Sequence, residues 1–555
     1  MAETALIKAF KRLSQGSKQS VQSGQSLDAL DKYLHVDRPI DIAVRTEMDN
    51  ICRIGGGIVM LVGSAGDGKS HIISTLQDDY KNVFEFWNDG SESPWPDVEP
   101  TEALKIILSD FKDNNINSTN YKLLLAINMG MLNKFIDDAE VQQQYGEIEK
   151  CAKTLFDADN LRHEQTDRVR IVSFGNHQIF ELYPEQDDVY PVDSTFIKNV
   201  LRKITSTDST NIFYQSYLAS KPIGSAYDPS YVNYQILCIP EIQDSIVKII
   251  IEAIVRFKLM LTPRELFDFI YRIIVPESIT TFNKSKDFFS TLLPSILFGG
   301  GENKILKALS QLDPLKHGCI EHNDELSHLF TSTNIPDEQE YNNLKTKLDA
   351  RFFDILDEYF RNNRANVEDI SKLLFRLKHL MHYHSESKEY KDYLSILCGY
   401  YSNDTERLYP LYETIKNSIP HFYGSYTDKT NIIPLDIQGR NFKMFVSCDN
   451  LEEAPGNNIP FNPDNRNQFV IEIDTCWKIN SPIGLKVGYQ LYEYLCSITQ
   501  GKLAQANDRD HNLAFSDFIS KLVRQTDYQK KITILTPDNQ QLTLIRTPFS
   551  KVTLK

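Results

Sequence analysis

A glycine-rich stretch of eight residues, GSAGDGKS at positions 63–70, constrains the fold of this chain more than any other feature. It directly follows a five-residue apolar run, Ile58–Val62, and leads into HIISTL, whose apolar residues have helical spacing. Continuous apolarity predicts a strand covered on both faces, so the region is expected to form a strand, a glycine loop and a helix. This context supports the match to the phosphate-loop pattern G-x-x-x-x-G-K-[ST].

Each residue type in this stretch suits the binding of phosphate. Glycines let successive backbone N–H groups point inward and form an anion site at a helix N-terminus. Lys69 is expected to reach the β- and γ-phosphates as a point charge, and the Ser70 hydroxyl to coordinate Mg²⁺. The predicted cofactors are ATP and Mg²⁺, and the predicted ATP-binding residues are Gly63, Ser64, Ala65, Gly66, Asp67, Gly68, Lys69, Ser70 and His71.

Further apolar runs predict the fold around this loop. Strands are expected at residues 82–87, 122–127 and 169–174, with helical segments such as 102–111 between them. This alternation predicts an α/β fold, a P-loop NTPase parallel sheet with helices on both faces. A helical region and an α+β C-terminal domain are expected to follow. The predicted domains are an N-terminal arm and helix (1–50), a nucleotide-binding core (51–195), a helical lid and helical domain (196–420) and the C-terminal domain (421–555).

Two details at the ends of the chain are also expected. Residues 14–26 have almost no large apolar side chains, so they are expected to form an extended or mobile arm. Strands are expected at 442–447 and 468–473, and KITILTPDNQQLTLIRT predicts a β-hairpin around a Pro-Asp-Asn turn.

Charge and cysteine content narrow the class of protein. The chain has 60 Lys+Arg and 75 Asp+Glu, a formal net charge of -15, so nucleic-acid contact needs a local basic patch or a basic partner. The eight cysteines include no C-x-x-C pair, which favours a reducing cytoplasm. Charged residues interrupt both the N-terminal segment and the apolar region 246–261. Neither a signal peptide nor a membrane span is therefore expected.

Hydrolysis of ATP also needs a carboxylate that holds Mg²⁺ or orients water. Asp110 lies in a segment with helical spacing, so a strand-end position is not favoured for it. Asp89 and Glu92 follow a predicted strand and would supply the carboxylate if their loop folds toward Ser70. Asn128 follows the strand 122–127, where it would orient water or serve as a capping or turn residue.

Arg264 is a candidate for contact with the γ-phosphate. Thr262, Pro263 and Glu265 form a capping-box pattern that fixes the start of the next helix. An arginine at such a helix start can supply charge to the γ-phosphate when a lid closes. The alternative is a surface arginine.

Three weaker patterns have structural explanations that are favoured over a site. His379, His382 and His384 match no common zinc spacing, and the basic residues between 361 and 391 fit a solvated helix surface better than a DNA patch. The third pattern is Asp464 with Glu472 and Asp474, which resembles a metal-nuclease core but has aspartate where lysine is expected.

Several segments together resemble one family. LDALDKYLHVDRPID, LVGSAGDGKSHIISTL, LLLAINMGMLNKF, TPRELFDFIYRIIVP and the C-terminal YQLYEYLCSITQGKL and FSDFISKLV look like DptF, the DNA phosphorothioation-dependent restriction protein family of bacteria. The resemblance implies an ATP-binding component of an antiviral defence module with DptG-like and DptH-like subunits, the latter a HerA-type helicase. It also implies that the module restricts DNA lacking the protective sulfur mark, and that this subunit engages DNA through the complex.

Three functions fit these features. The first is an ATP-binding and ATP-hydrolysing subunit of a DNA restriction complex, with Lys69, Asn128 and Arg264 as catalytic candidates. The second is an assembly scaffold in which the nucleotide is structural. The third is a signalling P-loop ATPase with no direct role on DNA. Phosphate release distinguishes the first from the second, and partner identity distinguishes the first from the third.

Overall fold

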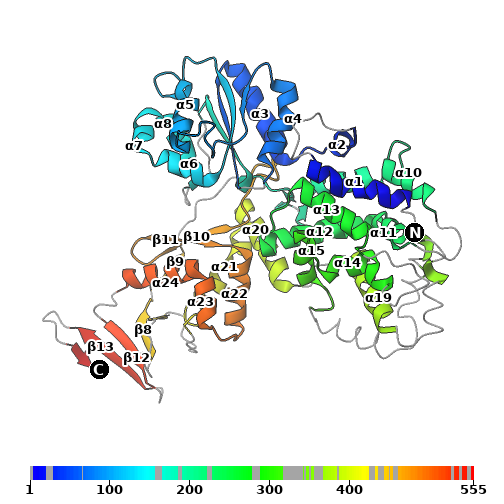
Figure 1. Cartoon of the computed structure of the whole chain (residues 1–555). Helices are drawn as coiled ribbons and strands as arrows, with labels where there is room; N and C mark the ends of the chain where they lie inside the picture. The colour runs from blue at the N-terminus through cyan, green and yellow to red at the C-terminus, as the bar shows by residue number, and fades with distance from the viewer. Residues whose placement is uncertain are drawn as a thin grey trace. The chain divides into compact units, whose positions relative to one another are not determined.

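The structure is a computed structural model. It describes residues 4–19, 29–64, 67–156, 166–185, 190–221, 228–277, 288–316, 342, 345–348, 352–354, 367–383, 387–423, 432–435, 443–448, 450–453, 461–526, 531–536, 540–546 and 552–554. The chain forms two compact units. Unit 1 comprises residues 1–156, 163–181 and 192–386, and unit 2 comprises residues 157–162, 182–191 and 387–555. Figure 1 shows the elements of both units.

A parallel sheet forms the centre of the first part of unit 1. Its strands are β1 (Gly57–Val62), β2 (Glu85–Trp87), β3 (Lys122–Ile127) and β4 (Val169–Ser173), in the order β2-β3-β1-β4. Val62 at the end of β1 lies opposite Ile127 of β3 and Ser173 of β4, and all the pairs are parallel. The expected mixed α/β class with a parallel sheet is confirmed. β2 is shorter than expected because residues 81–83 form a turn.

Helices pack on both faces of this sheet (Figure 1). One face is covered by α3 (Pro39–Ile54) and α4 (Lys69–Tyr80), which contact the side chains of Val59 and Leu61. The opposite face is covered by α5 (Pro100–Ile107), α6 (Met129–Ile136), α7 (Ala139–Gln144) and α8 (Gly146–Phe156), with η1 (Ser109–Phe111) after α5. Every residue of β1 is buried, which explains its continuous apolar sequence.

The rest of unit 1 is mainly helical. Its elements are α1 (Ala5–Gln19), α2 (Ala29–Leu34), β6 (Val192–Asp193), α9 (Thr195–Thr205), α10 (Ile212–Ala219), α11 (Pro229–Leu237), α12 (Pro240–Phe257), α13 (Pro263–Ile274), η3 (Phe288–Thr291), α14 (Leu293–Gly299), α15 (Lys304–Leu309), η4 (Ser310–Leu312) and α19 (Val367–Met381). Within the described residues, no helix is both long and apolar enough to cross a membrane.

The N-terminal helix corrects one expectation. Residues 14–19 belong to α1 and are not part of an extended arm, while residues 20–26 lie outside the described residues. Leu6, Phe10 and Leu13 are buried on one side of α1, and the Phe10 ring lies 5.0 Å from the Phe213 ring of α10. This anchored face allows the helix to continue into a polar sequence, since adding a residue to a formed helix costs much less than nucleating one.

Polar contacts join the end of α2 and the residues that follow it to α9. The Tyr33 hydroxyl donates to the Lys203 carbonyl at 2.7 Å. In return, the Lys203 ammonium donates to the carbonyls of Tyr33 at 2.5 Å and His35 at 2.8 Å. The chain then reaches Arg38, the N-cap of α3, within three residues of His35. This short segment therefore connects the helical part of unit 1 to the sheet part.

Unit 2 combines helices with antiparallel sheets. Its elements are α20 (Lys388–Ser402), α21 (Thr405–Ser418), β7 (Ile432–Pro434), β8 (Lys443–Ser447), β9 (Glu452–Glu453), β10 (Ile473–Lys478), β11 (Pro482–Val487), α22 (Tyr489–Thr499), α23 (Ala506–His511), α24 (Leu513–Gln525), β12 (Lys531–Leu535), β13 (Gln541–Arg546) and β14 (Val552–Leu554); β5 (Glu181–Leu182) spans the junction with unit 1. The expected domain boundary at 420/421 falls inside this unit.

Two strand predictions in unit 2 have different outcomes. The paired strands of the C-terminal hairpin are confirmed, because β12 and β13 pair antiparallel with Leu535 opposite Gln541, while the Pro-Asp-Asn turn lies outside the described residues. The strand expected at 468–473 is wrong, and β10 begins only at Ile473. Side chains on α20 form hydrogen bonds with the backbone groups of the residues that precede β10. The Tyr401 hydroxyl binds both the N–H and the carbonyl of Val470 at 2.9 Å, and Tyr393 donates to the carbonyl of Ile471 at 2.8 Å.

Candidate phosphate-binding site

The glycine-rich stretch lies at the carboxyl edge of the parallel sheet. Gly63 follows β1, and its N–H donates to the Ile127 carbonyl of β3 at 3.3 Å. Asn128 follows β3, and Gly90 after β2 donates to the Ala126 carbonyl at 2.7 Å. The residues after three neighbouring strands therefore meet at one edge, where parallel α/β sheets bind their ligands.

The loop leads directly into the N-terminus of α4. Gly68 is the N-cap, with a left-handed φ of 92° that favours glycine. The N–H groups of His71 and Ile72 bind the Gly68 carbonyl, and no side chain caps the helix. The N–H groups of Lys69 and Ser70 make no hydrogen bond to any acceptor among the described residues. The helix start thus offers backbone donors to an anion.

Lys69 brings a positive charge to this helix start. Its ammonium donates to the loop carbonyls of Gly63 at 3.0 Å and Ser64 at 2.7 Å. Burial lowers the pKa of Lys69, and the charges of Asp67 and Asp89 oppose that shift. The ammonium is therefore held over the loop by weak neutral acceptors, which a phosphate oxygen can replace with a stronger charge-assisted bond.

Asp67 stabilises the loop from within. Its buried carboxylate accepts a hydrogen bond from the Ser64 N–H at 2.5 Å. Burial raises the pKa of Asp67, while the Ser64 hydrogen bond, Lys69 and Arg38 oppose the shift. A Cβ atom on Gly63 would lie 2.7 Å from Asp67 Oδ2 and 2.6 Å from the Phe174 ring. Only glycine fits there, so the first loop position is fixed by close packing.

Arg38 is a site residue that the sequence did not indicate. It is 2% exposed, and its guanidinium donates to both carboxylate oxygens of Asp41 at 3.2 and 3.1 Å. Its Nη1 donates to the Asp67 carbonyl at 3.1 Å, and its Cζ lies 5.6 Å from the centre of the Phe174 ring. Arg38 thus fixes the backbone of the loop just before Gly68. In the sequence, an arginine before Pro39 gives no signal of such contacts.

The structure separates the candidate carboxylates. Asp89 follows β2, and its loop lies at this edge because the Ser91 hydroxyl accepts a hydrogen bond from the Asn128 N–H at 3.2 Å. The charge of Asp89 also opposes the lowering of the Lys69 pKa. Glu92 is exposed and makes no contact with the loop among the described residues, and Asp110 lies in the 3-10 helix η1, as its helical spacing indicated. Asn128 is the N-cap of α6, and its Oδ1 accepts from the Met131 N–H at 2.7 Å. Its capping role is therefore shown.

The four remaining predicted site residues are Ala65, Gly66, His71 and Arg264. Ala65 and Gly66 lie outside the described residues. His71 is exposed on the first turn of α4, and its ring lies 6.2 Å from that of His35. The capping box before Arg264 is confirmed, because Thr262 Oγ1 accepts from the Glu265 N–H and Glu265 from the Thr262 N–H. Arg264 itself is exposed and has no contact with the loop within the described residues.

The weaker sequence patterns gain no support as metal sites. The described residues include no cluster of three or more His, Cys, Asp or Glu side chains suited to a metal ion. The His379 ring packs against Phe298, and His384 lies outside the described residues. In the pattern that resembles a metal-nuclease core, Asp464 is exposed, and Asp474 Oδ1 lies 4.0 Å from Lys486 Nζ.

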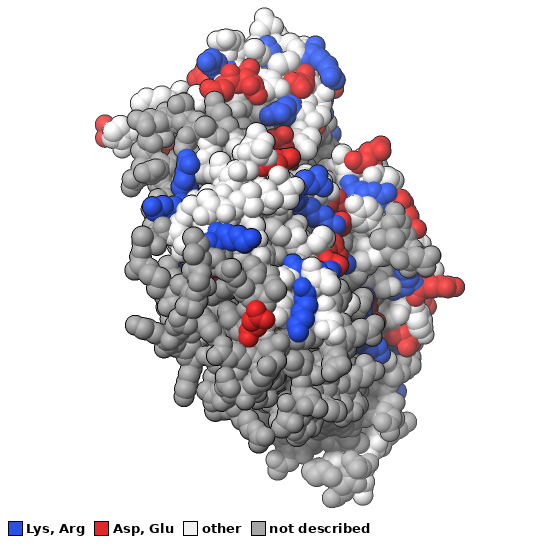
Figure 2. Space-filling model, turned by 90° about the vertical axis from the view of Figure 1, so that its right-hand side faces the viewer, with Lys and Arg blue, Asp and Glu red and all other residues white. Residues whose placement is uncertain are grey.

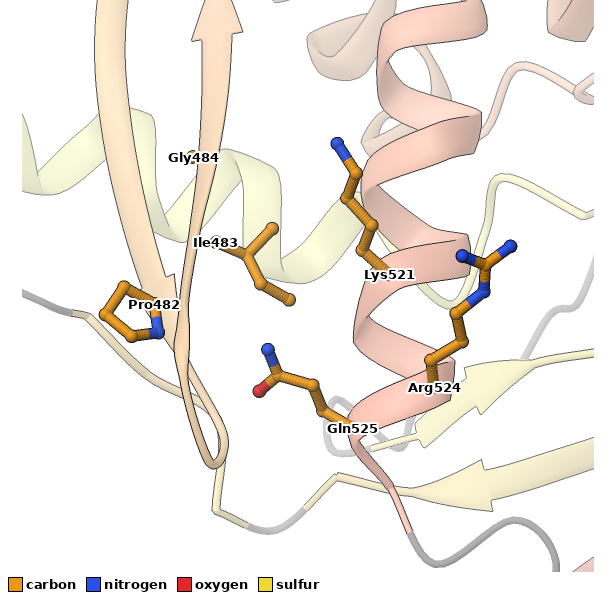
Figure 3. A pocket seen from close by; sticks show the side chains of 6 residues that line it. All are labelled: Pro482, Ile483, Gly484, Lys521, Arg524 and Gln525. Atoms are coloured by element: carbon orange, nitrogen blue, oxygen red, sulfur yellow. The ribbon is translucent and has the colours of Figure 1, made fainter. Parts of the chain in front are cut away.

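A shallow groove in unit 2 is lined in part by polar side chains that already have partners within the protein (Figure 3). It has a volume of about 400 Å³ and lies between β11 and α24. Gln525 points across it and binds Asn480 and Ser481, and Lys521 pairs with Asp517 at 2.7 Å. Arg524 points away from the strand. The groove therefore offers little that is specific to a ligand.

Comparison of this chain with family models, with curated proteins and with solved structures gives no match.

Proposed function

We propose that this chain binds ATP with Mg²⁺ at the edge of its parallel sheet. One observation carries the proposal: the N–H groups at the start of α4 and the Lys69 ammonium converge where the glycine-rich loop follows β1. These backbone donors and the ammonium suit a chain of phosphates, and the Ser70 hydroxyl is exposed beside them. A bound Mg²⁺ would neutralise the phosphate charge that develops during transfer.

The residues around the loop fit distinct roles. Lys69 would exchange its two carbonyl acceptors for phosphate oxygens, and Ser70 would be a metal ligand. Asp89, whose charge already acts on Lys69, is the carboxylate best placed to bind the hydration shell of the metal or orient water. Arg264 would approach only if the helical part of unit 1 closes over the loop.

We further propose that the chain is the ATP-binding, ATP-hydrolysing subunit of a DNA restriction complex that acts on unmodified foreign DNA in the cytoplasm. The support for this role is the sequence resemblance described above. The DptG-like and HerA-type DptH-like subunits are the proposed partners.

A structural role for the nucleotide is the second candidate, and one contact favours it. The Oδ1 atom of Asn128 already accepts the Met131 N–H that caps α6, so one of its two lone pairs is not available to orient water. Slow or absent hydrolysis would make the bound nucleotide a conformational latch. Phosphate release by the purified protein distinguishes the two functions.

The test of ATP binding compares Lys69→Ala with Lys134→Ala, an exposed lysine on α6 of the same sheet region. Calorimetric titration with ATP and Mg²⁺ should show at least a tenfold loss for Lys69→Ala, about 1.4 kcal/mol. Lys134→Ala should bind as the wild type does. Both variants should keep the wild-type melting temperature, since such substitutions change stability by about 0.5 kcal/mol or less. Unchanged ATP affinity in Lys69→Ala would refute the site.

A further inference from the structure

Basic residues gather on one helix of unit 1. Residues 4–19 contain Lys8, Lys11, Arg12 and Lys18 and no Asp or Glu, in a chain whose formal net charge is -15. The opposite face of α1 is buried, with Leu6, Phe10 and Leu13 among its core residues. The positions 8, 11 and 12 fall together on the other side of a helix with 3.6 residues per turn. Lys8 and Arg12 are exposed there, and Lys11 is half-buried.

The neighbouring helix extends this surface. The Leu6 N–H donates to the Ser220 hydroxyl at 2.9 Å, which places the end of α10 beside the first turn of α1. The next residue, Lys221, is exposed, and α10 itself contains no charged residue. Asp228 lies at this junction and accepts a hydrogen bond from the Thr4 hydroxyl at 3.2 Å. We call Lys8, Lys11, Arg12 and Lys221 the basic surface.

We propose that the basic surface binds the sugar-phosphate backbone of a nucleic acid. Figure 2 shows one side of the molecule, on which Lys and Arg side chains lie among Asp and Glu side chains and uncharged residues. One helical turn separates Lys8 from Arg12, about 6 Å along the axis. The rise of two nucleotides along one DNA strand is similar, about 7 Å. The two cations are therefore spaced to contact two phosphates of one strand that lie two nucleotides apart.

The composition of this surface favours nucleic acid over other acidic partners. Protein–protein interfaces are depleted in lysine at their centres, whereas nucleic-acid interfaces are polar and strongly basic. A helix that binds a lipid surface inserts its apolar face, and the apolar face of α1 is already packed in the protein core. As a nucleic-acid contact, the basic surface deepens the role on DNA proposed above. It needs no nucleotide at the phosphate loop, so its test can fail without affecting the ATP site.

The test uses full-length protein and a fluorescein-labelled duplex of 30 base pairs with arbitrary sequence. Lys8→Glu/Arg12→Glu reverses two charges of the basic surface. Lys521→Glu/Arg524→Glu is the matched control, because it changes the net charge equally at exposed positions on α24. Fluorescence anisotropy at 50 mM KCl should show at least tenfold weaker binding for the first pair and less than threefold for the control.

The salt dependence gives a second measure. Loss of two phosphate contacts should reduce the slope of log K against log salt by about 1.8, at about 0.9 for each phosphate. If the charge-reversal pair does not fold, Lys8→Ala/Arg12→Ala takes its place and should show the same loss of binding. Lys69→Ala should bind the duplex as the wild type does, because the phosphate loop is not part of the basic surface. Equal losses in the α1 and α24 pairs, or none, would overturn the proposal. Binding to vesicles of 30% phosphatidylserine without binding to the duplex would also overturn it.

Discussion

Replacing Arg38 with alanine should make the phosphate loop open more readily, because it removes the contacts that hold the loop against α3. The guanidinium makes two bonds to the carboxylate of Asp41, which is 9% exposed, and one bond to the carbonyl of Asp67. Removing one partner of a buried pair leaves an uncompensated charge and typically costs about 3–5 kcal/mol. We expect Arg38→Ala to lower the free energy of opening of the β1–α4 region by an amount in this range.

Backbone hydrogen exchange of the peptides covering residues 57–80 measures this opening in the full-length protein. Asp41→Ala and the double variant complete a cycle. The double variant should cost less than the sum of the two single variants by about 0.5–3 kcal/mol, because it leaves no charge unpaired. Arg38→Lys should restore only part of the loss, since an ammonium cannot reproduce the planar fork. A loss below about 1 kcal/mol in Arg38→Ala, or strictly additive losses, would refute the reasoning.

Three further variants probe the region around the site. Asp67→Asn keeps an oxygen acceptor for the Ser64 N–H but removes a buried negative charge, so calorimetry should show ATP affinity rising at least threefold, about 0.7 kcal/mol; weaker binding would contradict this. Arg264→Ala should weaken binding of a non-hydrolysable ATP analogue and leave ADP affinity within about threefold; equal losses for both ligands would remove it from the site. Burial lowers the pKa of His177, so its neutral form stabilises the fold above about pH 6.5 and that contribution falls away as the pH decreases, by up to about 1.4 kcal/mol per unit. The melting temperature should therefore fall less between pH 7.5 and 5.5 in His177→Gln than in the wild type. An identical fall in both proteins would show that His177 does not contribute to the pH dependence of stability.

Local sequence patterns predicted the parts of the fold that depend on neighbouring residues. The apolar run before Gly63 forms a strand buried on both faces, as its continuous apolarity required. The capping box at Thr262 and the antiparallel pairing of 531–535 with 541–545 also form as predicted, because both depend on residues close in sequence. The strand expected at 468–473 failed because tyrosines about 70 residues earlier bind its backbone.

The same distinction applies to the candidate site. The motif located Lys69 and Ser70, and strand ends indicated Asp89 and Asn128 as neighbours of the loop. The contact between Arg38 and Asp67 spans 29 residues and involves a backbone carbonyl, which is present at every position and therefore leaves no trace in the sequence. The support of the loop by α3 could be found only from the three-dimensional arrangement.

The short segment between Tyr33 and Arg38 acts as a tether of fixed length. One end is held by Lys203 at the carbonyls of Tyr33 and His35, and the other by Arg38 at the loop. The three residues from His35 to Arg38 can span at most about 10 Å when fully extended, so the tether has little slack. A displacement of the loop larger than this slack must move α9 or break one of these bonds. The loop and the helical part of unit 1 are therefore mechanically coupled.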